Sequence, residues 1–252
     1  TLRANGQAHT VGCITDTDRG TVANLFSRFM TVFGSPNYMS TPSVADAYEM
    51  ALYLMQGVQA TAGFDVENSD FILSFGAGII EGWGSPVRMF QANSKRIAGR
   101  AKLVQIEPRL SITAAKADQW IAINPGTEAD LALGLAHVII RENRQKANFI
   151  DKYTAGFDEW KQMVYNRYTP DEVVRTTGID KETLVSLARN FVRASRPLAI
   201  CGRGKGLTPG SLRETIAVLA LNALVGNINK PGGVLAVPEN DYIDWPETEM
   251  DR

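Results

Sequence analysis

The chain has only two cysteines and two histidines, and the two residues of each kind are far apart in the sequence. Its two cysteines, Cys13 and Cys201, do not form a Cys-x-x-Cys pair, so the sequence predicts neither a disulfide framework nor a zinc site. A single bridge between them stays open as an alternative to two free thiols at the ends of buried strands. The two histidines, His9 and His137, complete no Ser/His/Asp pattern, and His137 lies within an apolar segment where a packed core histidine is expected.

The chain also lacks an excess of charge and a long apolar run. The 26 Lys and Arg balance 27 Asp and Glu, for a formal net charge of −1, whereas proteins that bind nucleic acid carry a basic excess. We therefore expect no nucleic acid partner. The longest apolar runs, 131–140 and 216–225, have the length of core helices and are too short to cross a bilayer. The chain begins at Thr1, and we expect it to be a segment of a longer polypeptide, which leaves its targeting undetermined.

What the chain does contain is an alternation of short apolar runs and amphipathic segments. Hydrophobic residues make up 44% and charged residues 21%, as in ordinary globular α/β proteins. Strands are expected at 71–75, 103–106, 120–123 and 198–200, and helices at 21–33, 43–57, 85–98 and over roughly 13 residues after Thr127. The alternation predicts parallel sheets with helices on both faces. The glycine- and proline-rich stretch 226–239 is expected to be a loop.

A glycine turn directly follows the first of the four strands. Gly76, Ala77 and Gly78 end the apolar run at 71–75, where backbone N–H groups without a nearby Cβ can approach a phosphate. The spacing differs from Gly-x-Gly-x-x-Gly, so a nicotinamide-dinucleotide fingerprint is a poor match. A tight turn between strand and helix is an equal alternative.

An acidic residue follows the next strand, and another opens the helix after the third strand. Glu107 ends its strand with Arg109 close behind, so this carboxylate either holds a ribose or base edge or pairs with Arg109. Gly126, Thr127 and Glu128 then open a helix, with Thr127 as the expected cap. Glu128 either contributes to a ligand site or serves the helix dipole.

A second glycine turn follows the last strand. Gly202, Arg203 and Gly204 come directly after residues 198–200, and Lys205 adds a further positive charge. Arginine and lysine can neutralise a pyrophosphate, whereas solvated basic residues on a simple turn are the alternative.

Read together, these stretches resemble the large subunits of molybdopterin oxidoreductases, the dimethyl sulfoxide reductase superfamily. The segments that carry the resemblance are ILSFGAG, KLVQIEPRLSITAAKADQWIAINPGTEADLALGLAHVII, TAGFDEW, YTPDEVVRTTGIDKETLVSLARNF, PLAICGRG and ALVGNINKPGGV. They occur in order over nearly the whole chain, so the resemblance is specific at the level of the family. It implies redox chemistry on a small-molecule substrate.

The resemblance also implies a fold and a cofactor. It implies an α/β protein with two Rossmann-like parallel-sheet domains, helices on both faces, within a larger multidomain chain. Residues 1–150 would form a domain for molybdopterin guanine dinucleotide carrying molybdenum or tungsten, and 151–252 a connector with part of a second α/β domain. The residues matching stretches that hold one dinucleotide are Gly76, Ala77, Gly78, Glu107, Arg109, Gly126, Thr127 and Glu128. Gly202, Arg203 and Gly204 match a turn that faces the second guanine dinucleotide in the family.

Partners and location follow from the same resemblance. An iron–sulfur electron-transfer subunit and a membrane anchor subunit are expected, with a [4Fe-4S] cluster outside this segment. The expected location is periplasmic or membrane-associated.

One position departs from the family pattern. After Gly34 to Asn37 the family usually places a Cys, selenocysteine, Ser or Asp that ligates the metal, and matching Ser43-Val44 to the family motif puts Ala45 there. A methyl group cannot coordinate a metal, and Asp46 or Ser43 would serve only after a shift in register. Two hypotheses therefore stay open: a catalytic large-subunit segment, or a non-catalytic molybdopterin-like subunit of a membrane-associated quinone reductase complex.

Overall fold

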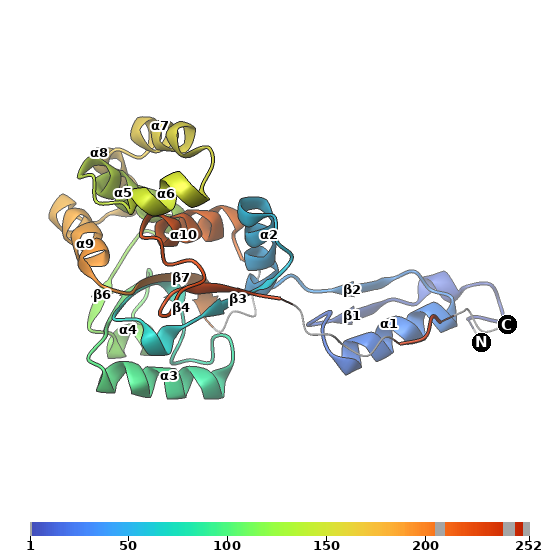
Figure 1. Ribbon diagram of the computed structural model, residues 1–252. Helices are drawn as coiled ribbons and strands as arrows, with labels where there is room; N and C mark the ends of the chain where they lie inside the picture. Colours follow the sequence, from blue (N-terminus) through green and yellow to red (C-terminus); the bar gives the residue numbers. More distant parts are fainter. Residues whose placement is uncertain (1, 205–209, 239–244, 249–252) are drawn as a thin grey trace. The chain divides into compact units, whose positions relative to one another are not determined.

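The computed structural model describes residues 2–204, 210–238 and 245–248, without the side chains of 203 and 204 (Figure 1). Contacts divide the chain into two compact units. Unit 1 comprises residues 1–43 and 240–252, and unit 2 comprises residues 44–239.

Unit 2 is built on a four-stranded sheet in the order β6-β5-β4-β7. Its strands are β4 (Phe71–Ala77), β5 (Lys102–Ile106), β6 (Gln119–Ile121) and β7 (Pro197–Gly204). Every neighbouring pair in this sheet is parallel. The carboxyl ends of the four strands therefore meet at one edge of the sheet.

Helices cover both faces of this sheet (Figure 1). On one side lie α3 (Pro86–Ala98) and α4 (Ile112–Lys116), and on the other lie α5 (Glu128–Arg141), α9 (Lys181–Arg193) and α10 (Leu212–Leu224). The apolar residues of α5 surround the helix, and this helix is accordingly buried along almost its whole length between the sheet and outer helices.

The outer layer beyond α5 consists of three short helices. They are α6 (Ala147–Tyr153), α7 (Phe157–Arg167) and α8 (Pro170–Thr177). Thr169 accepts a hydrogen bond from the Glu172 N–H at the start of α8, and Gly178 ends it with φ 80°. His137 of α5 packs edge-on against Tyr165 of α7, with ring centroids 4.9 Å apart. Burial lowers the pKa of His137, which keeps this imidazole neutral and supports the core role that the sequence predicts.

The remaining elements of unit 2 are α2 (Val44–Gln56), the 3-10 turn η2 (Val66–Asn68) and a small antiparallel pair. Strands β3 (Thr61–Phe64) and β8 (Val234–Val237) form that pair. The sequence predicted a loop over 226–239, and β8 is a correction. Its apolar residues find a partner in β3, a long-range pairing that local composition does not reveal.

Unit 1 contains a helix and a two-stranded parallel sheet. The elements are η1 (Ala8–Thr10), β1 (Cys13–Thr15), α1 (Thr21–Phe33) and β2 (Tyr38–Ser40), with β1 paired to β2. Helix α1 ends at Gly34, whose φ of 88° is the left-handed conformation that favours glycine. The guanidinium of Arg28 donates to the carbonyl of Pro246 at 2.7 Å, which joins the chain's two segments in this unit.

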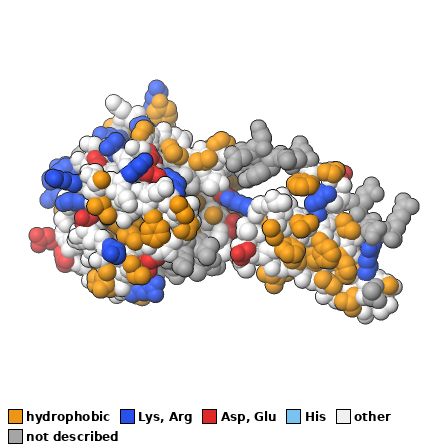
Figure 2. Space-filling view, turned by 90° about the horizontal axis from the view of Figure 1, so that it is seen from below, with side chains coloured by type: hydrophobic (Ala, Val, Ile, Leu, Met, Phe, Trp, Pro, Cys, Tyr) orange, Lys and Arg blue, Asp and Glu red, His pale blue; other side chains and the backbone are white. Residues whose placement is uncertain are grey.

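The apolar stripe of α1 does not face a core. Leu25, Phe26 and Phe29 are 63%, 43% and 55% exposed. Only Ala23 and Met30 of this helix are buried. Figure 2 shows hydrophobic side chains gathered on this unit.

The α/β class with a parallel sheet and helices is confirmed. The arrangement differs from the expected two sheets, because β7 pairs directly with β4 rather than opening a second sheet. The division by contacts falls after residues 43 and 239, not near residue 150. The helices between β6 and β7 return the chain to the far side of β4, where the apolar run Leu198–Ile200 is buried. None of the described helices is long and apolar enough to cross a membrane.

Candidate functional site

The carboxyl edge of the sheet brings together the turns that the sequence singled out. The side-chain N–H of Gln105 donates to the Ala77 carbonyl at 3.3 Å, and the Glu107 N–H donates to the Ile121 carbonyl at 3.2 Å. A Cβ built on Gly76 would lie 3.7 Å from the Gly202 carbonyl oxygen. The ends of all four strands are therefore neighbours. Strand order reverses between β4 and β7, and ligands of open parallel sheets bind at such a switch point.

The turn after β4 is tight and closed by its own backbone. Gly76 has φ 73°, a conformation that residues with a Cβ rarely adopt. The Gly78 carbonyl accepts from the N–H groups of Glu81 and Trp83 at 2.7 and 3.1 Å. Gly82 and Gly84 also have positive φ, so the whole turn depends on glycine.

The Glu81 side chain ties this turn to the loop after β5. Its carboxylate accepts from the Thr113 N–H at 3.0 Å and from the Thr113 hydroxyl at 2.7 Å. Burial alone would raise the pKa of Glu81, but the hydrogen bonds from Thr113 outweigh it and hold the pKa below its usual value. Sequence analysis missed Glu81, because its partner lies 32 residues further along the chain.

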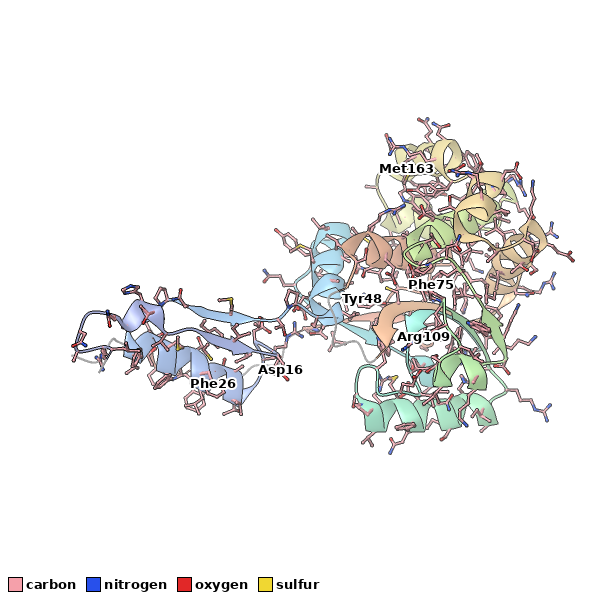
Figure 3. All side chains as sticks on the ribbon, turned by 180° about the vertical axis from the view of Figure 1, so that it is seen from behind. Asp16, Phe26, Tyr48, Phe75, Arg109 and Met163 are labelled. Atoms are coloured by element: carbon pink, nitrogen blue, oxygen red, sulfur yellow. The ribbon has the colours of Figure 1, made fainter. Side chains whose placement is uncertain are left out.

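At the end of β5, Glu107 is buried while Arg109 is exposed. The Glu107 carboxylate accepts from the hydroxyl of Ser111, and the Glu107 carbonyl accepts from the indole N–H of Trp120 at 3.1 Å. Ser111, rather than Arg109, is thus the partner found for this carboxylate among the described residues. Arg109 lies on the loop beyond the strand (Figure 3).

The start of α5 is open at Gly126. Gly126 has φ 79°, and no atom lies within 4 Å of where its Cβ would be. Thr127 is the N-cap residue of α5, as predicted, but its side chain makes no capping hydrogen bond. Its hydroxyl donates back to the Asn124 carbonyl at 2.6 Å. The first N–H groups of α5 therefore donate no hydrogen bond to the Thr127 side chain, and such groups favour anions. Glu128 is 7% exposed in the first turn of this helix.

The sequence predicted a glycine turn after this strand, but Gly202 lies within β7, near its carboxyl end, and other side chains pack against it. Gly202 has φ 132°, and a Cβ there would meet the indole nitrogen of Trp83 and Cγ1 of Val44, each at 2.8 Å. Arg203 and Gly204 end β7, and the Arg203 side chain lies outside the described part, as does Lys205. The first turn of α2 thus rests directly on this glycine.

A buried tyrosine fixes α2 to the same strand. The Tyr48 hydroxyl accepts from the Cys201 N–H at 2.8 Å and donates to the Cys201 carbonyl at 3.2 Å. Burial raises the pKa of the Cys201 thiol to about 12, so this thiol is protonated at neutral pH. Both cysteines are free, as predicted, although Cys13 is only half-buried. No sequence motif marked Tyr48, whose role is structural.

The first turn of α2 also carries Ala45, the position expected to hold a metal ligand. Ala45 is exposed, next to Val44, which lies on Gly202. Asp46 is rotated about 200° from Val44 around the helix and lines a hollow on the outer face of α2, so it does not point at the sheet edge. The described residues include no cluster of three or more His, Cys, Asp or Glu side chains that could hold a metal.

The residues of this edge fit the nucleotide part of a cofactor. Gly126 leaves open space before α5, and the start of α5 has no side-chain cap. One buried carboxylate, Glu107, follows the end of β5, and another, Glu128, lies in the first turn of α5. Bare N–H groups suit phosphate, and carboxylates suit the N–H groups of a base. The metal is a different case, because Ala45 offers it no ligand atom.

Comparison with known proteins agrees with this class of site. The family model described as molybdopterin oxidoreductase matches residues 4–237. The chain belongs to this family. It is 34% identical over 245 residues to the menaquinone reductase molybdopterin-binding-like subunit of Nitratidesulfovibrio vulgaris, covering 94% of this chain and 34% of that protein. It is 33% identical over 250 residues to the arsenate respiratory reductase molybdopterin-containing subunit of Shewanella sp. (strain ANA-3), covering 89% and 29%.

A solved structure shares the fold. Acetylene hydratase from Pelobacter acetylenicus superimposes with a TM-score of 0.67 at 23% identity, over 89% of this chain and 30% of that one. The chain spans about a third of the length of the curated relatives described above.

Proposed function

We propose that this chain is the cofactor-holding segment of the large subunit of a molybdopterin-dependent respiratory oxidoreductase. The observation that carries the proposal is the convergence of four turns at one sheet edge, with the switch point between β4 and β7. Relatives named as molybdopterin-containing subunits of arsenate respiratory reductase and of thiosulfate reductase support it. The cofactor form that we propose is a bis-molybdopterin guanine dinucleotide with molybdenum or tungsten.

Each turn has a proposed share in binding. Gly76 to Gly78 and the N–H groups at Gly126 to Glu128 would hold phosphate, since they present backbone donors. Glu107 and Glu128 would accept hydrogen bonds from guanine or ribose, and Arg109 would balance phosphate charge. Gly202 to Gly204 would face the second dinucleotide.

The bound cofactor would supply the two-electron chemistry at its metal. This chain's residues would bind and orient it, and the sheet edge would fix its position through rigid strand ends. We further propose an iron–sulfur subunit and a membrane anchor as partners, with a [4Fe-4S] cluster outside this segment. A small molecule would be the substrate.

A second candidate function rests on Ala45. A subunit that provides no side-chain ligand at this position suits a molybdopterin-like component of a quinone reductase complex, in which no substrate reacts at the metal. The similarity to a protein named as a molybdopterin-binding-like subunit of menaquinone reductase supports this candidate.

Analysis of the full-length protein separates the two candidates. Molybdenum or tungsten is measured by elemental analysis, and guanine is measured after acid release. Metal and guanine together support the oxidoreductase. Guanine without metal, or neither, contradicts it and supports the second candidate.

A further inference from the structure

Unit 1 buries very few apolar side chains of its own. Of its described residues, only Ala23 and Met30 of α1 have buried apolar side chains. The Tyr38 hydroxyl donates to the Ala23 carbonyl at 3.2 Å, so α1 lies on the face of the β1-β2 sheet that carries Tyr38. A sheet of two strands is marginal in water unless more strands or further packing support it. Unit 1 therefore needs additional apolar cover.

The sheet face opposite α1 is one place where this cover is missing. Ile14 of β1 and Met39 of β2 are directly paired in register, and each is next in its strand to a residue of the α1 side. Because successive side chains of a strand point to opposite faces, Ile14 and Met39 share the other face. They are 68% and 53% exposed. Parallel sheets are normally covered on both faces, so this face is incomplete.

One side of α1 is a second and larger apolar surface. We call it the α1 stripe, and its residues are Val22, Leu25, Phe26, Phe29 and Phe33. Their spacing i, i+3, i+4, i+7, i+11 places them within about 100° of the helix circumference. The first four are between 43% and 65% exposed, and the rings of Phe29 and Phe33 stack at 5.8 Å. The α1 stripe contains no charged residue, so it suits an apolar segment, and such contiguous surface marks an interaction site.

The length of the polypeptide indicates where this segment comes from. Both ends of the sequence, residues 1 and 252, belong to unit 1. The curated relatives described above are about three times as long as the part that this chain matches. Further segments of such a polypeptide would join this sequence at unit 1. The sheet of unit 2, in contrast, already has its own helices on both faces (Figure 1).

We propose that an apolar segment of the same polypeptide, outside residues 1–252, packs on the α1 stripe and completes the core of unit 1. A segment of the same chain is present at a high effective concentration from the start, which suits a unit that has so small a core of its own. The docking does not depend on the cofactor, because no residue of the α1 stripe belongs to the sheet edge of unit 2.

Cysteine labelling of the full-length protein tests whether the α1 stripe is covered. Leu25→Cys and Phe29→Cys place a thiol on the stripe. Asn24→Cys and Thr31→Cys are matched controls, since both residues are exposed on α1 at least a quarter turn away from the other two positions. The thiols at 25 and 29 are expected to react with a maleimide at least about tenfold more slowly than those at 24 and 31, because a covered thiol reacts only after local opening. In denaturant all four are expected to react alike.

Photo-crosslinking identifies what covers the stripe. In the full-length protein p-benzoyl-phenylalanine replaces Phe29, and in a control protein it replaces Asn24. After irradiation, mass spectrometry is expected to find an intramolecular link from position 29 to a peptide outside residues 1–252, which position 24 does not give. Equal labelling of the four cysteines, no link, or a link to residues 44–239, to a second copy or to a partner subunit overturns the proposal. Unchanged circular dichroism of each variant shows that its fold is intact.

Discussion

Two glycines at the same sheet edge, Gly202 and Gly126, have positive φ for different physical reasons. At Gly202 the space that a Cβ would take is filled by Trp83 and Val44, whereas at Gly126 that space is empty. The first glycine allows a helix to approach a strand end closely. The second leaves backbone exposed in front of a helix.

This difference separates a packing glycine from one that can serve a ligand. Both belong to motifs that resemble cofactor-binding stretches, and the sequence gives them equal weight. Only the surroundings show that the end of β7 contacts α2, partly through Val44, while the start of α5 has no side-chain cap and open space at Gly126. Replacing Gly202 or Gly126 by alanine adds a methyl group at that position and tests which glycine serves packing and which serves a ligand.

The largest effect is expected for Gly202→Ala. The new Cβ would meet Trp83 and Val44 at 2.8 Å in a conformation that L-residues rarely adopt. Backbone strain and overpacking together are expected to cost about 2–4 kcal/mol of the free energy of unfolding. Urea unfolding of the variant and the wild type measures this loss. A change below about 1 kcal/mol would show that the turn relaxes and that the packing is not tight.

The next effect is expected for Gly126→Ala, which combines modest strain with a methyl group in open space. The left-handed conformation is expected to cost about 1–2 kcal/mol of unfolding free energy. Because the methyl group lies where phosphate is proposed to bind, the guanine content of the full-length protein is expected to fall. Acid release of guanine, with protein quantified in parallel, measures it.

Gly156 supplies a matched control for that experiment. It has φ 72° with nothing within 4 Å of its Cβ position, at the start of α7. Gly156→Ala is expected to cost the same unfolding free energy and to leave guanine content unchanged. Equal losses of guanine in both variants would mean that strain alone, and not the site, controls binding.

A smaller and pH-dependent effect is expected at Glu81, which joins the turn after β4 to the loop after β5. Its pKa is lowered in the folded state, so its contribution is present above the unfolded-state pKa of about 4.3 and is lost as the pH falls through the folded-state value. Glu81→Gln is expected to cost about 1 kcal/mol near neutral pH and nothing below both pKa values. Urea unfolding between neutral and acidic pH measures this.

Thr113→Val is the control for this interaction. It removes the hydroxyl donor to Glu81 but keeps the backbone N–H that also donates. The variant is expected to show a reduced dependence of stability on pH, between those of the wild type and Glu81→Gln. If the stability of this variant depends on pH as that of the wild type does, the Thr113 hydroxyl is not the cause of the low pKa of Glu81.

Local sequence patterns predicted the elements of this fold well but not their long-range pairing. The apolar run ending in Gly76 predicted β4, and the helix ending at Gly34 begins and ends where expected. The pairing of β7 with β4, and of β8 with β3, depends on residues more than 100 positions apart in the chain. Periodicity within one segment carries no information about such partners.

The candidate site shows the same limit. Strand ends followed by glycine or an acid could be read from the sequence, and the parallel sheet then brings Gly76, Glu107 and Glu128 to one edge. The partners of these groups could not be predicted. Ser111 bonds to Glu107, and the Thr127 hydroxyl turns back to Asn124, because side-chain direction depends on the folded backbone.

The smallest effect is expected for Thr127→Val, which tests whether the backbone or a side chain binds the ligand next to Gly126. The hydroxyl donates to the carbonyl of Asn124, an exposed residue, so water can take its place and the unfolding free energy should change by only about 0.5 kcal/mol. If phosphate binds through backbone N–H groups, as the empty space at Gly126 indicates, guanine content is unchanged, since the backbone is the same. Loss of guanine in this variant, with stability intact, would mean that the hydroxyl leaves Asn124 to hold the ligand. The opening before α5 would then work through a side chain, and its contrast with the packed turn at Gly202 would need a different explanation.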